Sequence, residues 1–363
     1  MEKTAAIQSR QSYPGIDLTR FVCALLVVGI HVYPFGNNGD PMLTELNFLV
    51  QVWLGRISVP FFLICTGFFL FRDTDRTPFP ADKIRKYEKK LLRLYLLWTL
   101  LYFPLILKEI ILVHPQGIAS GLMRVVRNLL LSGSYYHLWY LQSALVAIAI
   151  VGLLRHRGVR VQRMLPFALL LFLIGLLPQT YFGILMRLRA RIPVVWKAWE
   201  VYEQIFVTTR NGIFEGFLYI AIGAWFAQCP RSIPLKGAAA GFVLSMALAL
   251  AELLVSRHLR WLREPDLYAF QVPCAFFLFS MASQLPLKES NHWSHLRHLA
   301  NITYFIHVWV YKLLESGFAA VGLDITVPCI FFLASAAVSL LLAEGLIRLQ
   351  KLPKFNFIRQ LYG

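Results

Sequence analysis

The chain has 363 residues, of which 58% are hydrophobic and only 15% are charged. Soluble domains carry nearer ~25% charged residues, so this composition argues against an ordinary soluble protein. The net charge of +17 could indicate a nucleic-acid-binding protein, but the basic residues lie between long hydrophobic blocks rather than in one patch, which is the pattern that the positive-inside rule predicts for a membrane protein.

Several hydrophobic blocks reach or approach the ~20 residues with which an α-helix crosses a bilayer. The sequence predicts transmembrane helices at residues 17–35, 47–71, 91–112, 138–155, 165–178, 212–228, 237–256, 267–284, 298–316 and 326–347. Helix boundaries are hardest to place between 179 and 211. Within that region, residues 181–206 form an amphipathic stretch that we expect on the outer membrane face, as a lid or as a simple connector. No repeat or low-complexity linker divides the chain, so residues 1–363 are predicted to be a single all-α polytopic bundle of about ten transmembrane helices.

The distribution of Lys and Arg predicts the orientation of this bundle. With the N-terminus inside, the inner connections hold most of the Lys and Arg residues that lie outside the helices. This bias places both termini in the cytoplasm.

The five cysteines form no CxxC pair and have no His at zinc-ligand spacing, so we expect neither a disulfide framework nor a metal site.

The first helix contains three ionisable residues, Asp17, Arg20 and His31. Such residues are costly inside a membrane, so each is a functional candidate. Arg20 and His31 are eleven residues apart, which places both on one helix face, ~16 Å apart along the axis. Asp17 precedes Arg20 by three residues and could hold its guanidinium. Structural roles stay open: Arg20 could reach lipid phosphates, Asp17 could be a first-turn acid, and His31 could be a packed histidine.

The segment GIDLTRFVCALLVVGIHVYPF at 15–35 resembles the first helix of the acyltransferase-3 family, in which an Arg, ten residues and a His are the hallmark. Further segments are similar to the family in the same order: VPFFLICTGFFLF at 59–71, KKLLRLYLLW at 89–98, YYHLWYLQ at 135–142, TRNGIFEGFLYIAIGAWFA at 209–227 and NITYFIHVWVY at 301–311. Thr66 stands where the family usually has Ser. The chain looks most like short members such as the O-acetyltransferases of enterobacterial common antigen, and also like the membrane half of some serine/alanine racemases.

The resemblance implies a multi-pass enzyme of the bacterial inner membrane. It would transfer an acyl group, usually acetyl, from cytoplasmic acyl-CoA to a hydroxyl of a surface glycan or of its lipid-linked precursor. Acyl-CoA would be a co-substrate, with no permanently bound cofactor. His31 would act as the general base, or as the carrier of an acetyl group.

The CoA phosphates need cations on the cytoplasmic side, and the candidates are Arg20, Lys89, Lys90 and Arg93, although the last three could be plain positive-inside charge. The candidates for acceptor binding are Arg56, His137, Trp139, Arg210, Asn211 and His307. Each of these acceptor-binding candidates also has a purely structural interpretation. His137 could belong to an interfacial aromatic belt and His307 could make a helix–helix hydrogen bond. Arg210 and Asn211 could be an anchor and a helix cap, and Arg56 could pair with a buried carboxylate or stabilise an oxyanion.

Two other function classes remain open. A transporter or flippase for a glycan or small polar solute would also use intramembrane charges such as Glu252 and Glu344, but no repeated half with broken helices is evident. A membrane-embedded sensor would not require the Arg20–His31 alignment.

For the enzyme, we expect one continuous cavity along the first helix, with Arg20 at its inner mouth and His31 deeper. The partners are membrane lipid, acyl-CoA and the acceptor, and not nucleic acid. No oligomeric state is predicted.

Overall fold

The structure is a computed structural model, and it describes residues 12–36, 39–72, 78–113, 117–229, 233–324 and 327–362. Over these residues the chain is all-helical and contains no strand. The helices are α1 (Pro14–Val32), α2 (Pro41–Phe48), the π-helix η1 (Leu49–Leu54), the 3-10 helix η2 (Gly55–Ile57), α3 (Ser58–Phe71), α4 (Ala81–Val113), α5 (Ile118–Leu131), α6 (Trp139–His156), α7 (Val161–Leu176), α8 (Phe182–Arg191), α9 (Pro193–Phe206), the π-helix η3 (Gly212–Gly216), α10 (Phe217–Gln228), α11 (Leu235–His258), α12 (Gln271–Ala282), α13 (Asn291–Ala320), α14 (Ile330–Leu349) and the 3-10 helix η4 (Pro353–Leu361).

Every one of the ten predicted segments contains a helix. Six helices of the described chain are long and apolar enough to cross a membrane, and three further apolar helices are shorter. The predicted all-α class is therefore confirmed, whereas ten membrane crossings and cytoplasmic termini stay predictions. The sequence-based bounds missed α5, which lies between the third and fourth predicted segments, and η4 near the C-terminus.

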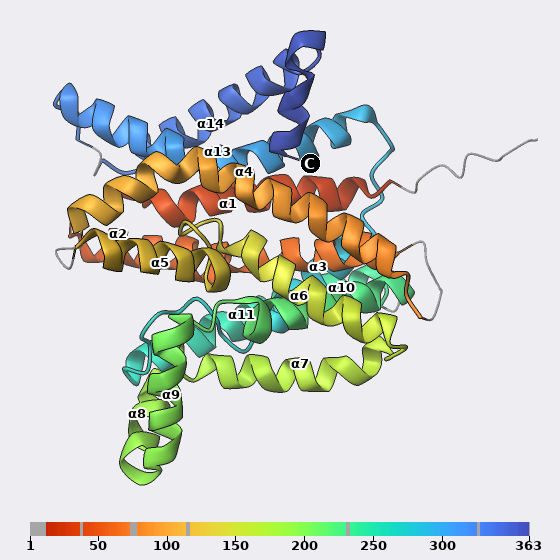
Figure 1. Cartoon of the computed structure of the whole chain (residues 1–363), viewed down its shortest axis with the longest axis vertical. Helices are drawn as coiled ribbons and strands as arrows, with labels where there is room; N and C mark the ends of the chain where they lie inside the picture. Colours follow the sequence, from red (N-terminus) through yellow and green to blue (C-terminus); the bar gives the residue numbers. More distant parts are fainter. Residues whose placement is uncertain are drawn as a thin grey trace, which may run out of the picture.

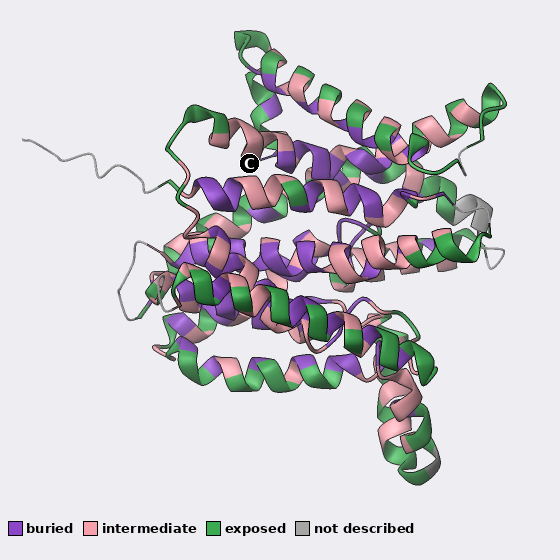
Figure 2. Cartoon of the chain, turned by 180° about the vertical axis from the view of Figure 1, so that it is seen from behind, coloured by how far each residue is buried: buried purple, intermediate pink, exposed green. Residues whose placement is uncertain are grey.

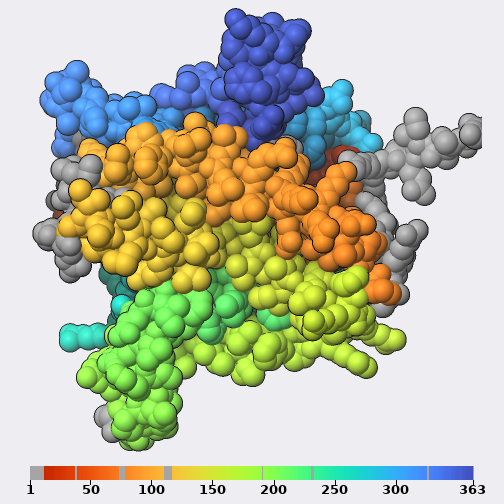
Figure 3. Space-filling model, in the orientation of Figure 1, coloured from red at the N-terminus to blue at the C-terminus, as the bar shows by residue number. Residues whose placement is uncertain are grey.

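The long helices run roughly side by side, with α13 and α14 along one edge of the bundle and α7 along the other (Figure 1). The predicted amphipathic stretch 181–206 forms α8 and α9, a helical hairpin that projects from the bundle across the direction of the other helices (Figures 1 and 3). Large apolar side chains such as Val194 and Val201 are exposed on it. Much of the outward surface of α7 and α14 is also exposed, whereas α1 and α3 are largely buried (Figure 2).

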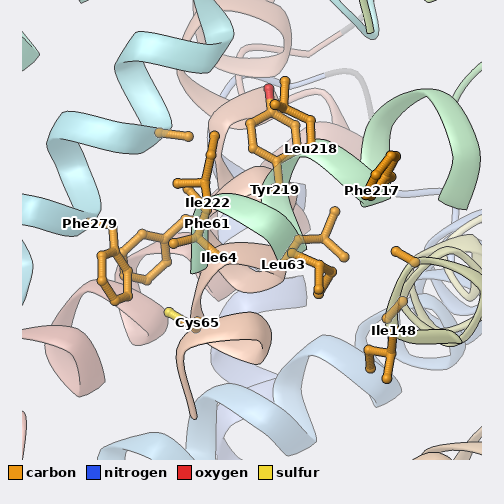
Figure 4. Packing of buried hydrophobic residues seen from close by; sticks show 14 of the residues in the cluster. Phe61, Leu63, Ile64, Cys65, Ile148, Phe217, Leu218, Tyr219, Ile222 and Phe279 are labelled. Atoms are coloured by element: carbon orange, nitrogen blue, oxygen red, sulfur yellow. The ribbon is translucent and has the colours of Figure 1, made fainter. Parts of the chain in front are cut away.

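The core of the bundle is the contact between α3 and α10 (Figure 4). A Cβ atom at Gly67 would overlap the backbone carbonyl of Ile220, and one at Gly223 would overlap that of Ile64. The two backbones therefore touch, which is how small residues pack membrane helices. This close contact fixes α3 and the start of α10, and both carry residues of the cavities described below.

Two of the apolar helical segments depart from regular α-geometry. The segment from Pro41 to Phe71 passes through η1 and η2 before it continues as α3. The segment that becomes α10 begins with the π-helix η3. Single π-helical turns inside helices are often found at functional sites. Both irregular segments contribute side chains to the same cavity.

Candidate active site

Helix α1 holds Arg20 and His31 as predicted, in its middle and in its last turn. Pro14 starts the helix, and it ends where Tyr33 takes a left-handed conformation (φ 49°) before Pro34. Proline cannot continue a helix, so this ending is local in origin. The two side chains line different cavities, one toward each end of the helix.

The cavity beside Arg20 has a volume of about 420 Å³, which is within the usual size of a cofactor site. Its cationic side chains are Arg20, Lys90 and Arg297, and its other lining residues include Thr66 and Tyr140. The Arg20 guanidinium lies 5.1 Å from the ring centre of Phe69. We call this the donor cavity. Three cations around one hollow can bind a polyanion.

The residue Thr66, which replaces the usual Ser, has a clear structural role at the wall of the donor cavity. Its hydroxyl donates to the backbone carbonyl of Phe62 and lies 3.0 Å from the hydroxyl of Tyr140. A hydroxyl at this position therefore ties α3 to α6, and Thr serves this purpose as Ser would.

The C-terminal segment closes part of the donor cavity. Tyr362 lines it, and the indole of Trp98 on α4 donates a hydrogen bond of 2.7 Å to the carbonyl of Leu361. Asn301 on α13 is 3.3 Å from the carbonyl of Tyr362. The end of the described chain is thus held against α4 and α13.

The cavity beside His31 is much smaller, about 30 Å³, and we call it the acceptor cavity. Its polar lining comes from five helices and three connections: His31, Arg56, Tyr136, His137, Trp139, Arg210, Glu215, Asp266 and Tyr304. Arg56 lies in η2 and Glu215 in η3, so the two helix irregularities aim ionisable side chains at the same space.

Asp266 is the centre of the charges in the acceptor cavity. Its carboxylate accepts from Arg56 Nη2 at 2.6 Å and from Arg210 Nη1 at 2.7 Å. Burial raises the pKa of Asp266, but Arg210 and Arg56 lower it further, so the net pKa is below its ordinary value. The carboxylate is therefore ionised at neutral pH. The guanidinium of Arg210 also lies 4.8 Å from the ring centre of Trp139.

Three imidazoles meet at the acceptor cavity. The ring of His307 stacks on that of His31 at 5.3 Å and lies edge-on to that of His137 at 5.4 Å. His307 Nδ1 is 2.7 Å from the carbonyl of Tyr304. Neither ring nitrogen of His137, nor Nε2 of His307, has a hydrogen-bond partner within the described chain. The described residues include no group of three His, Cys, Asp or Glu side chains arranged to hold a metal ion. Imidazoles can both take up and release protons near neutral pH.

Tyr304 on α13 separates the two cavities, because its side chain lines both. Its hydroxyl donates a 2.7 Å hydrogen bond to the backbone carbonyl of His137. Its ring packs edge-on against Phe62 and Tyr140. The predicted single cavity along α1 is therefore wrong as stated: Arg20 and His31 line two cavities that share one wall.

Some predicted site residues lie elsewhere. Asp17 does not pair with Arg20; it pairs with Arg297 on α13 at 3.2 Å. Asn211 caps η3 by accepting from the backbone N–H groups of Ile213 and Phe214, so the cap alternative holds for it. Of the basic residues at the start of the third predicted helix, Lys90 lines the donor cavity, whereas Lys89 and Arg93 are exposed and do not.

Several residues of the two cavities were not predicted as site residues, and four of them matter most for the chemistry: Glu215, Asp266, Arg297 and Tyr304. Glu215 is an acid at the start of an apolar helix, and that signal could have singled it out. Asp266 lies in the polar connection between α11 and α12, and Arg297 lies in the polar first turns of α13, just before the predicted helix at 298–316. Charges are ordinary in both places. Tyr304 looks like any aromatic residue of an apolar helix. The last three become visible only through packing between distant segments.

The chain is similar over most of its length to one protein family and to several racemases. The family profile described as "Acyltransferase domain" matches residues 13–344. Two amino-acid racemases of Enterococcus faecalis are 27% and 25% identical over 75% and 83% of this chain. The serine/alanine racemase of Enterococcus gallinarum is 27% identical over 81%. The matched regions are only 36%, 41% and 40% of these relatives, so the chain spans well under half of their length. No solved structure matches the chain significantly.

Proposed function

The chain belongs to the acyltransferase-3 family, and from that premise we propose that it is a membrane O-acyltransferase of the bacterial inner membrane. The donor would be cytoplasmic acyl-CoA, with acetyl as the expected acyl group. The acceptor would be a hydroxyl of a surface glycan or of its lipid-linked precursor. The observation that carries the proposal is that α1 lines a cationic cavity through Arg20 and a histidine-rich cavity through His31, and that one side chain, Tyr304, separates them.

The donor cavity suits the charge of CoA. A CoA molecule carries a 3′-phosphate and a diphosphate, and Arg20, Lys90 and Arg297 line the hollow that would receive part of it. Guanidinium groups bind phosphate through paired N–H donors, and the Lys ammonium adds a point charge. The thioester end would then point past Tyr304 toward His31.

The reaction transfers an acyl group from the sulfur atom of CoA to the oxygen atom of the acceptor hydroxyl. The acceptor hydroxyl oxygen attacks the thioester carbonyl while His31 removes the hydroxyl proton. The carbon–sulfur bond breaks, the CoA thiolate leaves, and the proton returns to it from His31. Imidazole is the side chain best suited to this exchange near neutral pH. The rival route, through an acetyl group on His31, uses the same two cavities.

The test is acetyl-CoA turnover by the purified, detergent-solubilised protein. Wild type should release CoA slowly, and His31→Ala should lower that rate by ~10²- to 10⁴-fold, the usual contribution of a general base. A matched control is His258→Ala, which removes a histidine at the exposed end of α11. Equal turnover by wild type and His31→Ala, with both proteins folded, would refute the assignment.

A transporter remains the second candidate because two cavities separated by one side chain could also serve alternating access. The charges first suggested for such a carrier have other partners. Glu252 accepts from the hydroxyl of Tyr181 and from two backbone N–H groups of the 259–270 connection. Glu344 pairs with Arg348 and His295. Solute uptake by vesicles that persists in His31→Ala would favour the carrier.

A further inference from the structure

The acceptor cavity contains several buried polar atoms that no described residue satisfies. They are Nε of Arg56, Nε of Arg210, Oε2 of Glu215 and both ring nitrogens of His137. Glu215 and His137 are 2% and 1% exposed. A buried polar atom without a partner costs as much free energy as a lost hydrogen bond. So many of them around one small space indicate a polar ligand that supplies the partners.

The two arginines that line this space favour an anion. Arg56 and Arg210 carry two positive charges and share the single carboxylate of Asp266. Each guanidinium has five N–H donors, and Asp266 accepts from one nitrogen of each. Among the donors that remain, the buried Nε–H of each arginine has no partner in the described chain and is available to a ligand. A planar guanidinium fits a carboxylate better than a neutral hydroxyl. The site is thus built from two donors that an oxyanion can bridge.

Glu215 is the remaining carboxyl group that faces the space, and its free oxygen Oε2 needs a hydrogen-bond partner rather than an anion. A ligand hydroxyl or ammonium would satisfy its free oxygen. The ligand therefore presents both signs: an oxyanion toward the arginines and a hydrogen-bond donor toward Glu215.

The size of the cavity limits how far apart these groups can be. A volume of about 30 Å³ holds only one or two small groups, since a single water needs ~10–15 Å³ measured in this way. The oxyanion that meets the arginines and the hydroxyl that meets His31 must then be carried on neighbouring carbons. The rest of a larger acceptor would stay outside.

We propose that the acceptor is a hydroxy acid whose reacting hydroxyl is one or two carbons from a carboxylate, with Arg56 and Arg210 as the carboxylate-binding pair. This inference rests on the proposed function, and it narrows the acceptor. A sugar acid and a β-hydroxy amino acid share this chemistry; the sugar acid lies within the proposed glycan acceptor, whereas the amino acid would replace it. Trp139 and Tyr136, which line the same cavity, would cover the apolar face of either one.

The experiment compares matched acceptors that differ only in the carboxylate. Glucuronate is paired with glucuronamide, in which a neutral amide replaces the carboxylate, and L-serine with ethanolamine. Purified wild-type protein is given acetyl-CoA and each compound, and the acetylated product is measured by mass spectrometry. We expect kcat/KM at least tenfold higher for the acid member of one pair. The pair that responds tells a sugar acid from an amino acid.

Variants then test the arginines. Arg210→Gln and Arg56→Gln should each remove the preference for the acid, whereas Arg257→Gln should retain it. Arg257 is a matched control because its partner Glu45 lies on the exposed surface. Arg210→Lys keeps the charge and covers the case in which Arg210→Gln fails to fold, and it should retain a reduced preference.

The outcomes separate this inference from the proposed function. Acetyl-CoA consumption with equal kcat/KM for both members of each pair would overturn the hydroxy-acid inference and leave the transferase standing. If none of the four compounds is acetylated, the comparison of CoA release by wild type and His31→Ala still tests the proposed function, and thermal melting tests the anion site alone. Glucuronate or L-serine should then raise the melting temperature of wild type but not of Arg210→Gln; no such difference would overturn the site.

Discussion

The imidazole of His31 stacks on the imidazole of His307, with ring centroids 5.3 Å apart and planes inclined by 25°. His307 is buried, and its Nδ1 is 2.7 Å from the carbonyl of Tyr304. A neutral His307 therefore donates through Nδ1, which assigns the lone pair to Nε2. The stacking holds the ring of His31 from one side, and the second ring is itself fixed by α13.

His307→Phe should test whether this contact matters beyond packing. The ring remains, but the nitrogen atoms are lost, so we expect kcat to fall on the order of tenfold to a hundredfold while KM for acyl-CoA changes little. Steady-state kinetics on purified protein separate the two constants. An unchanged kcat would mean that His307 only fills space.

Tyr304→Ala should join the two cavities. With the side chain that lines both removed, water can follow the acyl group from one cavity to the other. We therefore expect more hydrolysis of acyl-CoA for each acyl group transferred, measured as free CoA against acetylated product. Tyr304→Phe is the control because it keeps the ring; it loses only the hydrogen bond to the carbonyl of His137, at about 1–3 kcal/mol. An unchanged ratio in Tyr304→Ala would show that Tyr304 is not the partition.

Much of the cavity chemistry could be predicted from local sequence, because costly residues in apolar helices stand out. His31 and Arg56 were predicted in this way, and Arg210 was predicted from its place at the start of the sixth predicted helix. The structure brings all three to one cavity. What could not be predicted was pairing between distant segments. Helical spacing suggested Arg20 as the partner of Asp17, but the fold brings Arg297 to it across 280 residues. Asp266 likewise meets its two arginines only because the 259–270 connection folds over the end of the bundle.

Asp266→Asn should destabilise the protein and disturb both arginines. The two guanidinium groups would lose their shared counter-charge, at a cost on the order of 2–3 kcal/mol after allowance for their partial exposure. Because the folded pKa of Asp266 is below its ordinary value, its stabilising effect is present above the unfolded pKa and is lost only as pH falls through the folded value. The difference in melting temperature between wild type and Asp266→Asn should therefore be the same at pH 7 and pH 5.

The control for that experiment is Glu45→Gln, which breaks the exposed pair with Arg257 and should cost less than about 1 kcal/mol. If the difference in melting temperature between wild type and Asp266→Asn disappears by pH 5, the lowered pKa of Asp266 is contradicted. A loss of stability in Asp266→Asn no larger than that in Glu45→Gln would contradict the assignment of Asp266 as the shared counter-charge of Arg56 and Arg210.

Gly67→Ala and Gly223→Ala should each push α3 and α10 apart. The added methyl group meets backbone atoms of the facing helix rather than a flexible side chain, so it cannot be accommodated by a rotamer change, and overpacking of this kind costs about 1–3 kcal/mol. Gly345→Ala on α14 is the matched control, because no atom lies within 4 Å of its added Cβ, and it should be neutral or slightly stabilising. Melting temperatures in one detergent give the comparison, and equal values for all three variants would contradict the close contact. Activity should fall with stability in the first two variants, because α3 carries Thr66 of the donor cavity and α10 continues from Glu215 of the acceptor cavity. A separation of these two helices therefore displaces both walls at once, whereas a change on α14 displaces neither.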